Sequence, residues 1–124
     1  SDLPQEFYST FRNDLLIIQA HPFRKYEFIH DGCIHGLEIV NGNPRHDNRN
    51  NRALQYALAN PGLFRLCGSD THRTGDEGKT ALLSRVPIHD SFALRDVILR
   101  RDHSLWSEHE NDIILIGSES IGKC

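Results

Sequence analysis

Two side chains suited to metal chemistry follow a mostly apolar run in the middle of this sequence. Asp70 and His72 lie in the stretch Gly-Ser-Asp-Thr-His, directly after residues 63–67. If strand geometry continues through His72, both side chains lie on one face, because strand side chains alternate with a period of two. An earlier apolar run, 15–18, leads in the same way into His21. Imidazole and carboxylate groups suit Zn, Mn and Fe ions, so these residues predict a hydrolytic metal site at the ends of strands.

Alternating strands and helices are needed to place these residues at one edge of a sheet. Apolar runs bounded by turn residues predict four strands, over 15–20, 36–40, 63–70 and 80–86. Between the second and third strands, Asn48 and Asn50 are plausible N-caps of a helix that ends at the Asn-Pro-Gly stretch 60–62. A strand-helix-strand unit of this kind predicts a parallel sheet with a right-handed crossover.

Further elements are predicted on either side of this unit. Apolar residues at helical spacing indicate a helix over 3–13 and another over 87–101, the second capped by Asp90 or Ser91. Residues 112–116 predict a last strand, and the charged, Gly-containing stretch 73–78 predicts a surface loop. With no repeat and no linker, residues 1–124 are interpreted as a single unit.

The overall composition is that of an ordinary globular chain. Its 124 residues are 38% hydrophobic and 25% charged, with a net charge of −3, so no general affinity for a nucleic acid backbone is indicated. Three cysteines without C-x-x-C spacing predict reduced thiols. No apolar run approaches the roughly 20 residues that cross a bilayer, and the start lacks a signal-peptide pattern. We expect a cytoplasmic protein with no membrane partner and, because the chain contains no Met, a piece of a longer polypeptide.

The sequence resembles the C-terminal half of a PHP (polymerase and histidinol phosphatase) domain, a family of metal-dependent phosphoesterases. Residues 21–24, His-Pro-Phe-Arg, resemble the family's HPxR motif after an apolar strand. Residues 36–41, Gly-Leu-Glu-Ile-Val-Asn, resemble its G-hydrophobic-E-hydrophobic-hydrophobic-N strand, and residues 68–72 resemble its last motif. The core of the resemblance covers 15–73, and 79–124 is similar to the tail that follows some PHP domains. The order and separations of the three motifs fit as a set.

This resemblance implies a fold, a metal site and a reaction. The fold is α/β, with parallel strands and crossover helices, and forms part of a PHP-type (β/α) barrel that lacks its N-terminal strands. The implied ligands of divalent Zn, Mn or Fe ions are His21, Asp70 and His72. The residues implied to bind substrate or to support the ligands are Arg24, Glu38, Asn41 and Arg73. The implied reaction is attack of a metal-bound hydroxide on a phosphoester, with no catalytic residue assigned beyond the ligands.

Three functional interpretations remain open at this point. The first is a fragment of a phosphoesterase that acts on a small phosphate-containing substrate and is inactive without the N-terminal half, because the family's H-x-H motif is absent from the sequence. The second is a non-catalytic, PHP-derived module that binds a ligand or partner. The third is a nucleic acid phosphodiesterase of the same family, which the acidic balance disfavours. An open half-barrel exposes sheet edges and apolar surface, so we expect the missing half or a second copy of the chain as partner.

Overall fold

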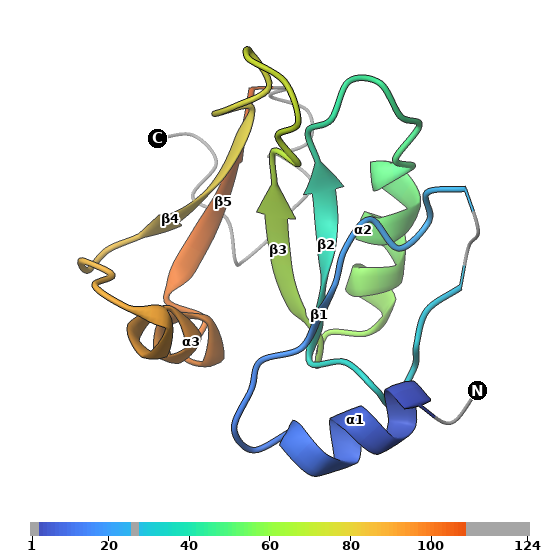
Figure 1. Ribbon diagram of the computed structural model, residues 1–124, viewed down its shortest axis with the longest axis vertical. Coiled ribbons are helices and arrows are strands. Elements are labelled where there is room, and N and C mark those ends of the chain that lie inside the picture. Colours follow the sequence, from blue (N-terminus) through green and yellow to red (C-terminus); the bar gives the residue numbers. More distant parts are fainter. Residues whose placement is uncertain (1–2, 26–27, 109–124) are drawn as a thin grey trace.

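The computed structural model describes residues 3–25 and 28–108. These residues form three helices and five strands, arranged as a small parallel sheet and a separate antiparallel hairpin (Figure 1). In chain order the elements are α1 (Leu3–Phe11), β1 (Ile18–Gln19), β2 (Gly36–Asn41), α2 (Asn50–Ala59), β3 (Phe64–Gly68), β4 (Thr80–Ser84), α3 (Ser91–Leu99) and β5 (His103–Ser107). The predicted α/β class is confirmed, whereas the described residues form no closed barrel.

The parallel sheet has the order β1-β2-β3, as the strand-helix-strand pattern predicts. Its first strand is much shorter than the predicted 15–20, because the backbone of Ile17 bonds chiefly to His35, just before β2, and only at 3.3 Å to Gly36. The Ile17 N–H donates to Nδ1 of His35 at 2.9 Å, and the Ile17 carbonyl oxygen accepts the N–H of His35 at 2.8 Å. Only Ile18 and Gln19 therefore pair with β2.

The core lies where α2 packs on β2 (Figure 1). Leu37 and Ile39 of β2 are fully buried and belong to the same cluster as Ala53 and Ala57 of α2. The start of β2 lies so close to β3 that a Cβ at Gly36 would come 2.4 Å from a backbone oxygen of β3. A residue without a side chain is therefore required at the point where the two strands begin to pair.

The predicted N-caps of α2 are wrong. Arg49 is the N-cap residue, in the left-handed region with φ 50° and ψ 48°, and no side chain caps the helix. Asn48 and Asn50 bond to the end of β2 instead: their Nδ2 atoms donate to the Asn41 carbonyl oxygen at 3.2 and 3.1 Å. The two asparagines thus stabilise the loop between β2 and α2, and the predicted end of the helix at Asn60 is confirmed.

The antiparallel hairpin contains a strand that the sequence did not predict. β4 confirms the strand expected over 80–86, although it ends at Ser84, and it pairs along its length with β5. β5 was missed because three of its five residues are polar, yet His103, Ser104 and Ser107 are all buried. The predicted strand over 112–116 lies outside the described residues.

The helix between the two hairpin strands begins as the sequence predicts. The Oδ1 atom of Asp90 accepts the N–H of Ala93 at 2.8 Å, so Asp90 is the N-cap of α3. The helix is shorter than the predicted 87–101, as α1 is shorter than the predicted 3–13. Among the described residues, no helix is both long and apolar enough to cross a membrane.

Candidate functional site

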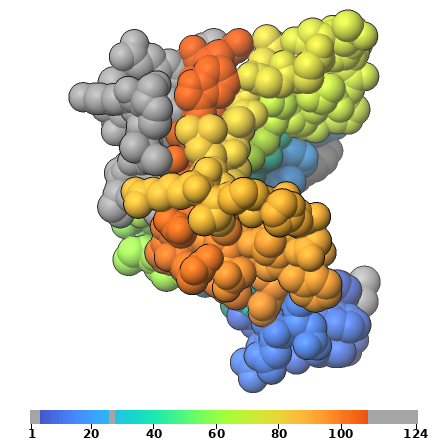
Figure 2. Space-filling model, turned by 90° about the vertical axis from the view of Figure 1, so that its left-hand side faces the viewer, coloured from blue at the N-terminus to red at the C-terminus, as the bar shows by residue number. Residues whose placement is uncertain are grey.

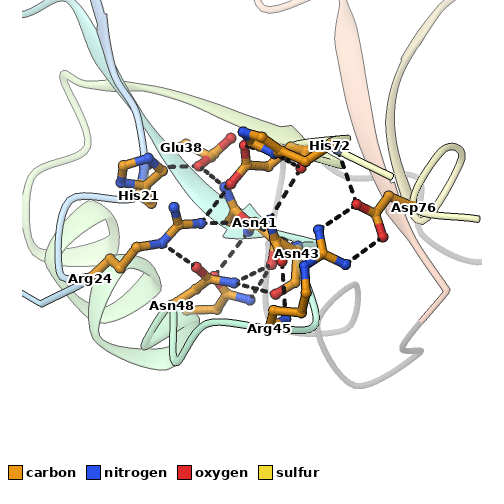
Figure 3. A network of polar contacts seen from close by, with 11 residues as sticks. His21, Arg24, Glu38, Asn41, Asn43, Arg45, Asn48, His72 and Asp76 are labelled. Carbon is orange, nitrogen blue, oxygen red and sulfur yellow. Dashed lines mark hydrogen bonds and ion pairs between the residues drawn. The ribbon is translucent and has the colours of Figure 1, made fainter. Parts of the chain in front are cut away.

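The three sequence motifs meet at one edge of the parallel sheet (Figure 3). His21 follows β1, Asn41 is the last residue of β2, and Asp70 follows β3. Since the strands are parallel, all three carboxyl ends lie at the same edge, where ligands bind in open α/β sheets. The structure therefore brings together residues that are far apart in the sequence.

A β-bulge in β2 places Glu38 and Asn41 on the same side of the sheet. The register with β3 shifts between Glu38 and Val40, so that one residue of β2 has no partner of its own. Residues three apart in a regular strand face opposite sides, but Asn41 Nδ2 donates to Glu38 Oε1 at 2.8 Å. Ile39 and Val40, which lie between them, are both buried in the core. The bulge thus aims two polar side chains at the site and two apolar ones into the core.

The Asn41 side chain makes four hydrogen bonds within the site. Besides Glu38, its Nδ2 atom reaches Asp70 Oδ2 at 3.3 Å. Its Oδ1 atom accepts Nη2 of Arg24 at 3.1 Å and the N–H of Asn43 at 2.9 Å. With 3% of its surface exposed, Asn41 joins all three motifs in a single network.

Arg24 holds one oxygen of Asp70. Its Nη2 atom donates to Asp70 Oδ2 at 2.7 Å, and its Nε atom donates to Asn48 Oδ1 at 2.8 Å. Partial burial opposes ionisation of Asp70, but the bonds from Arg24 and Asn41 outweigh it and lower the pKa of this carboxyl group. Asp70 is thus held as a carboxylate, with its orientation fixed through Oδ2.

Glu38 lies between His21 and His72 in the view of Figure 3. Its Oε1 atom accepts the backbone N–H of His21 at 2.8 Å, while a Cβ at Gly68 would come 2.9 Å from Oε2. The missing side chain at Gly68 therefore leaves the space that the carboxyl group occupies. Burial raises the pKa of Glu38, although the bonds from Asn41 and the His21 backbone oppose the shift.

Asp70 and His72 lie together, but not through strand alternation. β3 ends at Gly68, and Asp70 has the left-handed φ of 53°. The resulting turn places Nδ1 of His72 2.9 Å from the Asp70 carbonyl oxygen and 3.4 Å from Asp70 Oδ1. The predicted proximity is confirmed and its predicted cause is wrong. The His72 side chain is 66% exposed, so it is open to a ligand from solution.

Two residues that the sequence reasoning missed organise the loop after Asp70. The Oδ2 atom of Asp76 accepts the N–H groups of His72 and Arg73, both at 3.0 Å. Arg45 donates to Asp76 through both arms of its guanidinium group, at 2.9 and 2.6 Å. This bidentate bond and the backbone donors hold the pKa of the Asp76 carboxyl group well below its usual range. Neither residue belongs to the three motifs, and no local pattern distinguishes them from other charged loop residues.

The side chains able to bind a metal ion at this edge are His21, Glu38, Asp70 and His72. Within residues 3–25 and 28–108, however, no three His, Cys, Asp or Glu side chains come together as a group that could hold a metal ion. Two of the four also have unusual backbone conformations, since His21 has a φ of 27° and Asp70 one of 53°. Strained residues of this kind often occur at functional sites, so this edge of the sheet is a candidate functional site.

Comparison of the chain with protein-family models, with curated proteins and with solved structures found no match in any of the three.

Proposed function

We propose that this chain provides one part of the metal centre of a PHP-like phosphoesterase, with His21, Asp70 and His72 as ligands. The observation that supports this most strongly is the direct contact between motifs that lie far apart in the sequence. Arg24 of the first motif bonds to Asp70 of the third at 2.7 Å, and Asn41 of the second bonds to both. Parallel strands bring the three stretches to one edge of the sheet, and the direct hydrogen bonds between their polar side chains go beyond that general placement.

The chemistry of the donors fits a divalent ion. Imidazole nitrogen and carboxylate oxygen suit Zn, Mn or Fe, and such an ion, when bound, supplies an ionised water near neutral pH and neutralises a phosphate group. The chain's own residues orient the donors: Arg24 and Asn41 occupy Oδ2 of Asp70, which leaves Oδ1 facing His72. The exposed Arg73, next to this pair, is the residue that we assign to the phosphate oxygens of a small substrate.

The remaining ligands come, in this proposal, from outside the described residues. Three candidate ligands that do not form a metal-holding group cannot complete a centre that several ions share in the family. The H-x-H motif that supplies further ligands there has no counterpart in the 124 residues. We therefore assign the rest of the centre to the N-terminal half of such a domain or to a second copy of this chain, and we expect the isolated chain to hydrolyse phosphoesters very slowly.

Calorimetric titration of the purified chain with Mn²⁺ and Zn²⁺ tests the ligand assignment. We expect weak binding that is abolished in the double variant Asp70→Ala, His72→Ala, because both remove a donor. His89→Ala is the matched control, since His89 is exposed and far in sequence from the three motifs. Equal binding by the double variant and the wild type would refute the assignment. Rapid hydrolysis of a phosphomonoester by the 124-residue chain would refute the claim that the centre is incomplete.

The second candidate is a non-catalytic module that binds a ligand or partner at the same edge of the sheet. It is favoured by the lack of a three-ligand group among the described residues. The titration separates the two candidates, because a non-catalytic module of this kind does not use Asp70 and His72 as metal ligands and should give the same heats for the wild type and the double variant.

A further inference from the structure

The loop that carries His72 has no regular secondary structure to hold it. It runs from the end of β3 at Gly68 to the start of β4 at Thr80, and it projects from the molecule at the end opposite α1 (Figure 2). Most of its residues are exposed, and Gly75 and Gly78 have φ values of 97° and 77°. Something other than strand pairing must fix the backbone of His72.

Asp76 is the exception within this loop, because only 4% of its surface is exposed. Its carboxylate accepts the N–H groups of His72 and Arg73, and its own N–H donates to the Arg73 carbonyl oxygen at 3.0 Å. One side chain thus closes the turn on which His72 lies. Both oxygens of Asp76 are already engaged, so it does not offer a further metal ligand.

Arg45 fixes Asp76 to a different loop, the one between β2 and α2. The bidentate bond from Arg45 to the Asp76 carboxylate has a defined plane and direction, which a lysine could not reproduce. Arg45 is itself held by Asn43, whose Oδ1 atom accepts the Arg45 N–H at 3.0 Å. Asn43 in turn is bonded to Asn41 at 2.9 Å and to the Asp70 carbonyl oxygen at 3.3 Å.

These contacts form a closed ring of hydrogen bonds (Figure 3). It leads from Asn41 through Asn43 and Arg45 to Asp76, and from there to the loop backbone at His72. The His72 ring completes it by its contact with Asp70. We infer that Arg45 and Asp76 are positioning residues, which hold the backbone of His72 so that its ring stays beside Asp70. The inference rests on the proposed function only in treating His72 as a metal ligand.

Two readouts test the inference, and only one of them involves metal. Trypsin cleavage after Arg73, followed by mass spectrometry under native conditions, reports how firmly the loop backbone is held. Mn²⁺ titration reports the placement of the His72 ring. In Asp76→Asn we expect cleavage to accelerate at least tenfold and Mn²⁺ affinity to fall about tenfold, the lower end of the range seen when the groups that orient a metal ligand are removed.

Two further variants distinguish the loss of positioning from a general loss of stability. Arg45→Lys keeps the charge and loses the two-pronged geometry, so we expect changes of the same direction and smaller size. Asp90→Ala removes a carboxylate that also accepts a backbone N–H, but in α3, and should leave both readouts unchanged. If Asp76→Asn fails to fold, Arg45→Lys alone decides the matter.

Cleavage and affinity within twofold of the wild type in the folded variants would overturn the inference. If the wild type binds no Mn²⁺ while cleavage after Arg73 accelerates in Asp76→Asn, the positioning role stands and the metal ligand assignment fails. If Mn²⁺ binds and neither variant affects cleavage or binding, the metal ligand assignment stands and the positioning role fails.

Discussion

Replacing Asn41 by alanine should destabilise the whole protein, although the side chain removed is small. The substitution deletes three bonds to charged groups, those of Glu38, Asp70 and Arg24, and one to the backbone of Asn43. A hydrogen bond to a charged group contributes about 1.5 to 3 kcal/mol. The bond to Asp70 is long at 3.3 Å, and water entering the vacated space restores part of the loss. We therefore expect the free energy of unfolding to fall by about 3 kcal/mol.

Urea unfolding followed by circular dichroism at pH 7 measures this change. Asn51→Ala is the matched control, because Asn51 is an exposed residue near the start of α2, where alanine favours the helix. We expect the control to alter the free energy of unfolding by less than about 0.5 kcal/mol. A loss of under 1 kcal/mol in Asn41→Ala would show that the bonds of this side chain are replaced by water, and that it does not hold the motifs together.

Three further predictions concern packing, capping and pH. Gly36→Ala should lower the free energy of unfolding by about 2 kcal/mol, because the new Cβ meets backbone atoms of β3. Gly62→Ala is the control in the same urea titration and should have little effect, because a Cβ at Gly62 meets no atom within 4 Å. Asp90→Ala removes the bond to the Ala93 N–H and should cost about 1 kcal/mol; a change below 0.3 kcal/mol would mean that the cap is replaced by water. Burial raises the pKa of the Cys67 thiol to about 11, so the folded protein retains a proton that the unfolded chain, with a cysteine pKa of about 8.5, releases. Stability should therefore fall as pH rises through this window, and less steeply in Cys67→Ala when unfolding is compared at pH 8 and pH 10.

The sequence predicts the parallel part of the fold well and the hairpin poorly. In β2, α2 and β3 the apolar residues follow the periods of strand and helix, and β2 and α2 supply most of the buried core. In β5 the pattern is misleading, because His103, Ser104 and Ser107 are polar and buried. Their burial depends on β4 and on neighbours distant in the sequence, and no local period reveals such neighbours.

The candidate site was also predicted only in part. The motifs predict that His21, Asn41 and Asp70 share one edge of the sheet, since parallel strands end together. The loop geometry could not be predicted in this way, because the approach of His72 to Asp70 depends on a left-handed Asp70. Arg45 and Asp76 lie 31 positions apart, and a bidentate bond between two loops leaves no periodic signal in the sequence.

The bulge in β2 gives the two neighbouring strands different tolerances to a change in chain length. Deleting either Ile39 or Val40 would turn β2 into a regular strand in which Glu38 and Asn41 are two positions apart and still share a face. The loss would be one buried side chain. β3 contains no spare residue, so a deletion there would move every later side chain of the strand to the opposite face and shift the start of the turn that carries Asp70. During evolution, β2 can therefore lose a single residue with its polar side chains still directed at the site, whereas β3 must keep its length.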